Sequence, residues 1–216
     1  VVQVAAELLA LHPPSEQAAR ESVRQTLLRG VGRITELLRQ LRQSTVITKE
    51  RVKIEKQRVF LPDLLGALNK EFSPIAARRG LSWRCECGEE LYVQADRTLL
   101  YIAIKNLVHN AIRFTPDGGA VHVAVSTELG LIRCTVSDTG VGIADDQREA
   151  IFSAFYEVGS SMSHTSGDYS FRSGGLGLGL PTVRSILSAH GSSLEFQSVV
   201  DKGSSFFFSL SAEAPV

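Results

Sequence analysis

Two asparagines and an arginine share one face of a helix predicted over residues 97–114. Asn106, Asn110 and Arg113 follow one another at spacings of four and three, which places their side chains on one side of a helix. A carboxamide oxygen is a good Mg²⁺ ligand, and a guanidinium suits phosphate oxygens. Asparagine is a poor helix former, so this pair favours a functional role over the alternative of solvated surface residues. The stripe predicts a site for a magnesium-bound phosphate.

An aspartate and two glycines stand at the end of a predicted strand, in the segment Asp138-Thr139-Gly140-Val141-Gly142. An ionised carboxylate only accepts hydrogen bonds, so it suits the exocyclic amino group of adenine and not the carbonyl that guanine carries there. Gly140 and Gly142 allow the backbone to pass close to a flat base and to adopt turn dihedrals. The segment alone is an ordinary turn, but beside the asparagine stripe it predicts an adenine site.

A ladder of glycines, GGLGLGL at 174–180, precedes a helix predicted over residues 178–190. Glycines leave backbone N–H groups open at a helix N-terminus, which makes a cradle for polyphosphate. The run is not a Walker A loop, because no Gly-Lys-Ser/Thr follows, and it lacks the setting of a dinucleotide motif. The alternative is a flexible hinge. The polar residues 157–173 before it are predicted to form a mobile lid, in which His164 and Arg172 are candidates for phosphate contacts.

Other groups that can carry chemistry have simpler structural interpretations. Phe152, Phe155 and Tyr156 have the spacing of a core-packing stripe. Cys85 and Cys87 share one face of an extended segment and are interpreted as buried small residues, with a metal or disulfide role as the less favoured alternative. Three histidines have no mutual spacing that suggests a metal site and are predicted to be ordinary helix, strand and helix-end residues: His109, His122 and His190.

The elements that position these groups alternate between helices and short strands. Helices are predicted over residues 62–80, 97–114, 145–154 and 178–190. Extended segments are predicted at 52–60, 81–93, 121–125, 131–137, 193–199 and 204–211. This order predicts an α+β fold in which a mixed sheet is covered by helices on one face, a two-layer α/β sandwich.

Residues 1–60 have a different pattern, with apolar residues at helical spacing on both sides of a break at His12-Pro13-Pro14. The second helix carries a heptad seam formed by Val23, Leu27, Gly30, Ile34, Leu37 and Leu41. Two helices joined by a short turn make an α-helical hairpin, and a narrow seam with charged flanks needs a partner. A homodimeric four-helix bundle is therefore predicted, with a hairpin packed on its own domain as the alternative.

Composition limits the classes of protein to which the chain can belong. Among 216 residues, 23 Lys and Arg balance 23 Asp and Glu, so no basic field suggests nucleic acid. No run of about 18 apolar residues is present, so a membrane-spanning helix is not expected. Three cysteines, an odd number, fit a reducing cytoplasm. The chain begins at Val1 without Met or a signal peptide, which suggests a fragment whose parent attaches to a membrane, if at all, through upstream segments.

Four segments in fixed order resemble motifs of the catalytic and ATP-binding domain of sensor histidine kinases, in a wider class of ATPases that includes DNA gyrase. They look like the N, G1, F and G2 boxes of that family: NLVHNAIRF (106–114), DTGVGI (138–143), IFSAF (151–155) and GGLGLGL (174–180). Residues 190–211 are similar to the family's closing strands, with Ser204 where Thr is usual. The resemblance implies a Bergerat-type ATP-binding domain over residues 59–216, preceded by part of a dimerisation hairpin at 1–58.

The resemblance also implies roles for individual residues. Asn110 would ligate Mg²⁺, with Asn106 supporting it and Arg113 acting as a cation near the phosphates of ATP. Asp138 would bind the adenine amino group. The other implied nucleotide-binding residues lie in the two glycine segments, Gly140 and Gly142 beside the base and Gly175, Gly177, Leu178 and Gly179 beside the phosphates.

Two departures from the family pattern bear on activity. Leu176 stands where Thr or Ser is usual, which can remove one phosphate contact. The phosphoacceptor box is absent, because His12 lies at a helix break, is followed by Pro13 and has no acidic neighbour there. The substrate histidine is therefore expected upstream of this chain, unless the parent protein lacks one.

The expected function is that of the cytoplasmic kinase core of a two-component sensor histidine kinase. Such a core is an ATP-dependent protein-histidine kinase that uses Mg·ATP. Its expected partners are a second copy, joined through the N-terminal helices, and the receiver domain of a response regulator. The alternatives are a nucleotide-binding regulatory module without phosphotransfer and an ATPase clamp of the gyrase type.

Overall fold

The chain divides into two compact units, Val1–Gln43 and Ser44–Val216. The computed structural model describes residues 21, 23–28, 30–31, 54–88, 90–156, 171 and 176–213. In the first unit the described residues are helical, and they include Val23, Leu27 and Gly30 of the predicted seam. The rest of that seam and the predicted first helix lie outside the described residues. The domain limits at 1–58 and 59–216 and the homodimeric bundle stay predictions.

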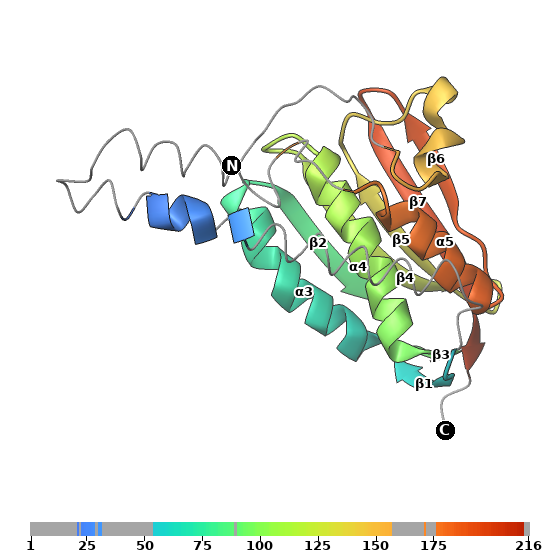
Figure 1. Ribbon diagram of the computed structural model, residues 1–216. Helices are drawn as coiled ribbons and strands as arrows, with labels where there is room; N and C mark the ends of the chain where they lie inside the picture. Colours follow the sequence, from blue (N-terminus) through green and yellow to red (C-terminus); the bar gives the residue numbers. More distant parts are fainter. Residues whose placement is uncertain are drawn as a thin grey trace. The chain divides into compact units, whose positions relative to one another are not determined.

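A seven-stranded mixed sheet forms the centre of the second unit (Figure 1). Its strands are β1 (Gln57–Phe60), β2 (Ser82–Cys87), β3 (Tyr92–Ala95), β4 (Ala120–Glu128), β5 (Leu131–Asp138), β6 (Glu195–Val199) and β7 (Gly203–Glu213). They lie in the order β1-β3-β7-β5-β4-β2, and β6 also pairs with β7. β2 and β4 are parallel, and the remaining described pairs are antiparallel.

Three helices lie together on one face of this sheet, α3 (Leu61–Arg78), α4 (Arg97–Phe114) and α5 (Gly179–Ala189) (Figure 1). Strand side chains alternate between the two faces, so every second residue of β4, β5 and β7 points to the core. Val125, Cys134 and Phe208 stand opposite one another across these strands, and all three are buried. α4 contributes one apolar stripe to the same core: Leu100, Ala103, Ile104, Leu107, Val108, Ala111 and Ile112. The predicted two-layer α/β sandwich is confirmed.

The segment between β5 and α5 differs from its prediction. In place of one helix over 145–154 it contains two short 3-10 turns, η1 (Asp145–Gln147) and η2 (Ala150–Phe152). Phe152 and Tyr156 pack against the core as predicted. Phe155 is 65% exposed, and its φ is +67°, so its place in the core-packing stripe was wrong. Residues three and four apart share one face only in a continuous helix, and this backbone leaves the helical conformation at Ser153.

The cysteines are small residues of the sheet. Cys85 and Cys87 lie half-buried on one face of β2, where they pack against the core, and Cys134 is buried in β5. Burial raises the pKa of Cys85 to about 11 and also raises the pKa values of Cys87 and Cys134, so these thiols stay protonated. The part of the chain that the structure describes holds no cluster of three or more metal-ligating side chains of the His, Cys, Asp or Glu type. Among the same residues, no helix is long and apolar enough to cross a membrane.

Candidate functional site

The asparagine stripe lies on the half-buried side of α4. Asp96 caps this helix, because its Oδ1 accepts a hydrogen bond from the backbone N–H of Leu99 at 3.0 Å. Asn106 Nδ2 donates to the carbonyl oxygen of Ile102, one turn earlier, at 2.9 Å. Asn110 makes no side-chain hydrogen bond with any described residue. One asparagine is therefore fixed by its own helix, and the other is open to a ligand.

The N-terminus of α5 faces these two amides. A methyl group added at Gly179 would lie 3.5 Å from Asn106 Oδ1 and 3.6 Å from Asn110 Nδ2. Leu178 occupies the N-cap position, and no side chain caps the helix there. The start of α5, with its first free N–H groups and the positive end of its dipole, therefore lies beside Asn106 and Asn110, and a helix N-terminus is suited to an anion.

Asp138 is the second part of the candidate site and lies at the end of β5. Its Oδ1 accepts hydrogen bonds from the backbone N–H groups of Gly140, at 2.8 Å, and Ser204, at 3.2 Å. Its Oδ2 accepts none from the described residues. Burial raises the pKa of Asp138 to about 6, and the two backbone hydrogen bonds oppose that rise. The carboxylate is thus held at one oxygen and available at the other.

Gly140 and Gly142 are required by close packing of backbone segments. A side chain at Gly140 would collide with the carbonyl oxygen of Phe114, the last residue of α4. Gly142 has φ +67°, and a side chain there would collide with the carbonyl of Val199 in β6. The loop after Asp138 is therefore pressed between the end of α4 and the β6–β7 turn.

The second glycine segment is only partly described. Gly177 has φ +62°, and a side chain at this position would collide with the backbone of Tyr156. Its carbonyl accepts a hydrogen bond from the N–H of Phe155 at 3.2 Å. This contact anchors the start of α5 on the F-box segment. In this segment and the predicted lid before it, His164, Arg172, Gly174 and Gly175 lie outside the described residues.

A family model for the histidine kinase-, DNA gyrase B- and HSP90-like ATPases matches residues 95–214 of the chain. This span contains α4, the Asp138 loop and α5, which together form the candidate site. The chain belongs to this ATPase family.

Sensor histidine kinases are among the relatives of this ATPase domain. The chain is 35% identical over 180 residues to sensor histidine kinase RppB of Synechocystis sp., covering 82% of this chain and 38% of RppB. It is 30% identical over 160 residues to signal transduction histidine-protein kinase BaeS of Escherichia coli, covering 74% of this chain and 33% of BaeS. The chain therefore spans between about a third and two fifths of the length of these relatives.

Solved structures of histidine kinases share the fold of the ATPase domain. The catalytic domain of histidine kinase ThkA in a nucleotide-free form superposes with a TM-score of 0.61 at 26% identity, covering 73% of this chain and 95% of that one. Full-length ShkA in complex with AMPPNP superposes with a TM-score of 0.74 at 24% identity, covering 93% of this chain and 40% of that one.

Several residues that support the candidate site carry no signal in the sequence. Ser198, buried in β6, accepts a hydrogen bond from the N–H of Ile143 at 2.8 Å and donates to the carbonyl of Gly203 at 3.0 Å. This serine ties the loop after Asp138 to the β6–β7 turn. Serine is common in strands and turns alike, so no spacing could have identified it.

His190 connects the far ends of the two site helices. Its Nε2 accepts a hydrogen bond from the N–H of Asp96 at 2.9 Å, and its Nδ1 lies 2.8 Å from the carbonyl of Ile186. These partners require the neutral tautomer with the proton on Nδ1. The prediction of a helix-end residue is confirmed, because His190 is the C-cap of α5. By fixing this end, His190 helps set where Gly179 lies against Asn106 and Asn110.

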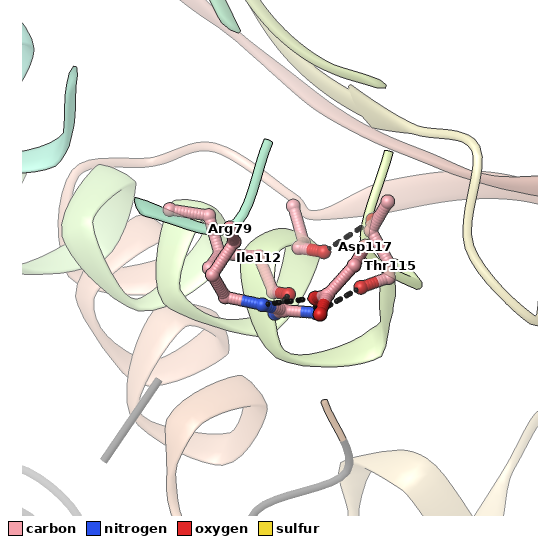
Figure 2. Close-up of polar contacts among 5 residues, drawn as sticks. Arg79, Ile112, Thr115 and Asp117 are labelled. Atoms are coloured by element: carbon pink, nitrogen blue, oxygen red, sulfur yellow. Dashed lines mark hydrogen bonds and ion pairs between the residues drawn. The ribbon is translucent and has the colours of Figure 1, made fainter. Parts of the chain in front are cut away.

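Arg79 comes just after the last residue of α3, and like Ser198 it has a structural role that the sequence did not indicate (Figure 2). Its guanidinium donates to the carbonyl oxygens of Ile112, at 2.6 Å, and Thr115, at 2.8 Å, and to the Asp117 carboxylate at 2.7 Å. A basic residue before a glycine is usual at the end of any helix, so its type and position predict nothing specific.

Proposed function

We propose that this chain is the ATP-binding core of a two-component sensor histidine kinase. The observation that carries the proposal is the proximity of Asn106 and Asn110 to the N-terminus of α5, which no side chain caps. The partly free Asp138 carboxylate, at the end of β5, is the second observation. The Asp138 carboxylate can accept a hydrogen bond from a base, and the start of α5 can bind an anion. Together they suit a nucleoside triphosphate.

In this proposal, Oδ2 of Asp138 accepts a hydrogen bond from the adenine amino group. The N–H groups of the segment containing Gly175, Gly177, Leu178 and Gly179 bind the phosphates. Arg113 is half-buried on the same helix as the two asparagines, and it supplies a positive charge near the phosphates. Gly140 and Gly142 hold the loop beside the base, because both pack closely on neighbouring backbone.

The residues fit a magnesium ion held together with the nucleotide. Asn110 offers a neutral carboxamide oxygen that no described residue uses, next to the expected phosphate position. Mg²⁺ in nucleotide sites is commonly held by one or two protein oxygens plus phosphates and waters, so a single amide ligand is sufficient. When bound, the ion neutralises charge on the phosphate oxygens. The bond to Ile102 fixes the Asn106 side chain, whose Oδ1 lies beside Gly179 at the start of α5.

Phosphotransfer to a histidine, dimerisation and the response regulator belong to the parent protein. RppB and BaeS are sensor kinases, which favours transfer to a histidine over a module without phosphotransfer. One solved structure of the same fold is histidine kinase ThkA in complex with response regulator protein TrrA, with a TM-score of 0.71 at 20% identity. We place the acceptor histidine upstream of Val1, the dimer contact in the N-terminal helices, and the domain in the cytoplasm, with any membrane anchor in the longer protein.

Calorimetric titration with ATP, with and without Mg²⁺ and with GTP as a control, tests the binding step. Binding of Mg·ATP in preference to Mg·GTP is expected, because Asp138 accepts and does not donate when ionised. The transfer step is tested by extending the chain upstream with its native sequence and searching for acid-labile phosphate on histidine. Absence of ATP binding would refute the nucleotide site. Binding without phosphohistidine in the extended dimer would favour a regulatory module.

We expect the affinity for Mg·ATP to fall as the pH drops below about 6, because burial raises the pKa of Asp138 to about 6. Oδ1 is occupied by two backbone N–H groups, so the added proton resides on Oδ2 and turns the acceptor into a donor. The loss approaches about tenfold per pH unit below the pKa.

Lower pH is expected to affect folding through Asp138 in the opposite direction to its effect on nucleotide binding. Its folded pKa lies above the unfolded value, so the folded state binds the proton more tightly and stability improves as pH falls through about 6. Titrations between about pH 7.5 and 5.5, corrected for nucleotide ionisation, measure the binding effect. Thermal unfolding over the same range measures the folding effect. A pH-independent affinity would contradict the assignment of Asp138.

A further inference from the structure

The turn from α4 to β4 is held by a residue from another element. Arg79 follows α3, and it reaches the carbonyl oxygens of Ile112 and Thr115 as well as the carboxylate of Asp117 (Figure 2). Its side chain is only 10% exposed, whereas that of Asp117 is 74% exposed. The guanidinium is therefore packed against the end of α4, and Asp117 contacts it from the solvent side.

Only arginine has the geometry for this contact. The last carbonyls of a helix have no partner within the helix, and a cation near them interacts favourably with the helix dipole. A guanidinium presents several N–H groups in a rigid plane, so it can bind two carbonyls and a carboxylate at once. A lysine ammonium at the same place is a flexible point charge that cannot hold all three in fixed geometry.

The two carbonyls that Arg79 holds lie on either side of Phe114, and the carbonyl of Phe114 supports the Asp138 loop. It accepts a hydrogen bond from the N–H of Val141 at 3.1 Å. It also lies so close to Gly140 that any side chain there would collide with it. Gly140 in turn donates its N–H to Asp138 Oδ1 at 2.8 Å. The chain of contacts runs from Arg79 through the end of α4 to the carboxylate.

We propose that Arg79 is a positioning residue for the base end of the nucleotide site, acting by fixing the end of α4 on which the Asp138 loop rests. This inference rests on the proposed nucleotide-binding function. Arg79 touches neither base nor phosphate in this role. Its loss displaces the loop and the carboxylate, and leaves Asn110 and the start of α5 in place.

The test uses Arg79→Lys in the full chain, with Arg78→Lys as the matched control, because Arg78 is exposed and in the last turn of the same helix. Affinities for Mg·ATP and Mg·ADP are expected to fall by the same factor, about tenfold, since both nucleotides share the base. The dependence of ATP binding on Mg²⁺ stays as in the wild type. The control binds both nucleotides normally.

Two further readouts separate positioning from general destabilisation. The amide proton of Val141 is expected to exchange faster with solvent in Arg79→Lys, while the amides of α5 keep their protection. The pH midpoint of nucleotide binding is expected to move upward, because a weaker bond from Gly140 removes a contact that lowers the pKa of Asp138. A lower melting temperature with an unchanged midpoint and unchanged Val141 exchange would reduce Arg79 to a structural residue.

Asp117→Asn carries the test if Arg79→Lys does not fold, because the Asp117 side chain is exposed and its replacement removes the negative charge from the outer contact of Arg79. A loss of about two- to threefold for both nucleotides, with faster Val141 exchange, supports the inference. Normal binding and exchange in the variant that folds overturn the inference while leaving the ATP site intact. Failure of the wild-type chain to bind ATP overturns the proposed function as well, which separates the two failures.

Discussion

Asp138→Asn is expected to lower the affinity for ATP by about tenfold to a hundredfold, the range for removing the partner of one buried hydrogen-bonding group. The asparagine carbonyl can still accept the hydrogen bonds that Gly140 and Ser204 donate to Oδ1. At the position of Oδ2, however, it presents an NH₂ group, which faces the adenine amino group donor to donor. The substitution therefore removes recognition of the base and keeps the local backbone.

Folding of Asp138→Asn is expected to be intact at neutral pH. Burial disfavours the charged carboxylate, as its raised pKa indicates, and a neutral amide avoids that cost. The measurement is a calorimetric titration with ATP and GTP beside a thermal unfolding curve. Asp146→Asn is the matched control, because Asp146 is exposed in η1 and makes no hydrogen bond with the described residues. Unchanged ATP affinity in a folded Asp138→Asn variant would refute the adenine assignment.

Asn110→Ala is expected to abolish the effect of Mg²⁺ on triphosphate binding. The carboxamide oxygen is the only ligand that we assign to the ion from this chain, and it has no other use among the described residues. Its loss should reduce the affinity for Mg·ATP by about tenfold to a hundredfold. The affinity for ATP without the metal should change little. Alanine is the better helix former, so helix stability does not fall at this position.

The matched comparison for Asn110→Ala is Asn106→Ala, one turn earlier on α4. Asn106 lies beside Gly179 at the start of α5 and is not assigned to the metal, so its removal is expected to weaken ATP binding to a similar extent with and without Mg²⁺. Titrations of both variants at several Mg²⁺ concentrations separate the two roles. If Asn110→Ala keeps the wild-type Mg²⁺ requirement, Asn110 does not hold the metal.

Local patterns in the sequence were sufficient for the features that depend on one element. The spacing of Asn106, Asn110 and Arg113 places them on one side of α4 because the helix repeats every 3.6 residues wherever it packs. The extended segments predicted at 121–125 and 131–137 lie within β4 and β5, where a strand's two-residue repeat alternates side chains between the core and the other face. Element order and the four motifs then predicted the mixed sheet, the helical layer and the family.

The prediction of one helix over residues 145–154 was wrong, and so was the side-chain placement that depended on it. The spacing of Phe152 and Phe155 predicts a shared core face only in a continuous helix. Phe152 ends a 3-10 turn, and Phe155 itself has φ +67°, which places its side chain in solvent. Backbone conformation in this short segment depends on its contact with Gly177, which lies more than twenty residues later.

Tertiary structure alone decided which distant residues support the site. The residues concerned bind backbone atoms of other elements: Arg79, Ser198 and His190. Every residue except proline has the same backbone N–H and carbonyl groups, so the sequence does not show which of them a distant side chain will bind. Burial, and with it the raised pKa of Asp138, also exists only once the sheet and helices enclose the carboxylate. The sequence by itself determined the chemical groups and the faces on which they stand. The packing of α3, α4, α5 and the β6–β7 turn decided their separation, their exposure and their charge.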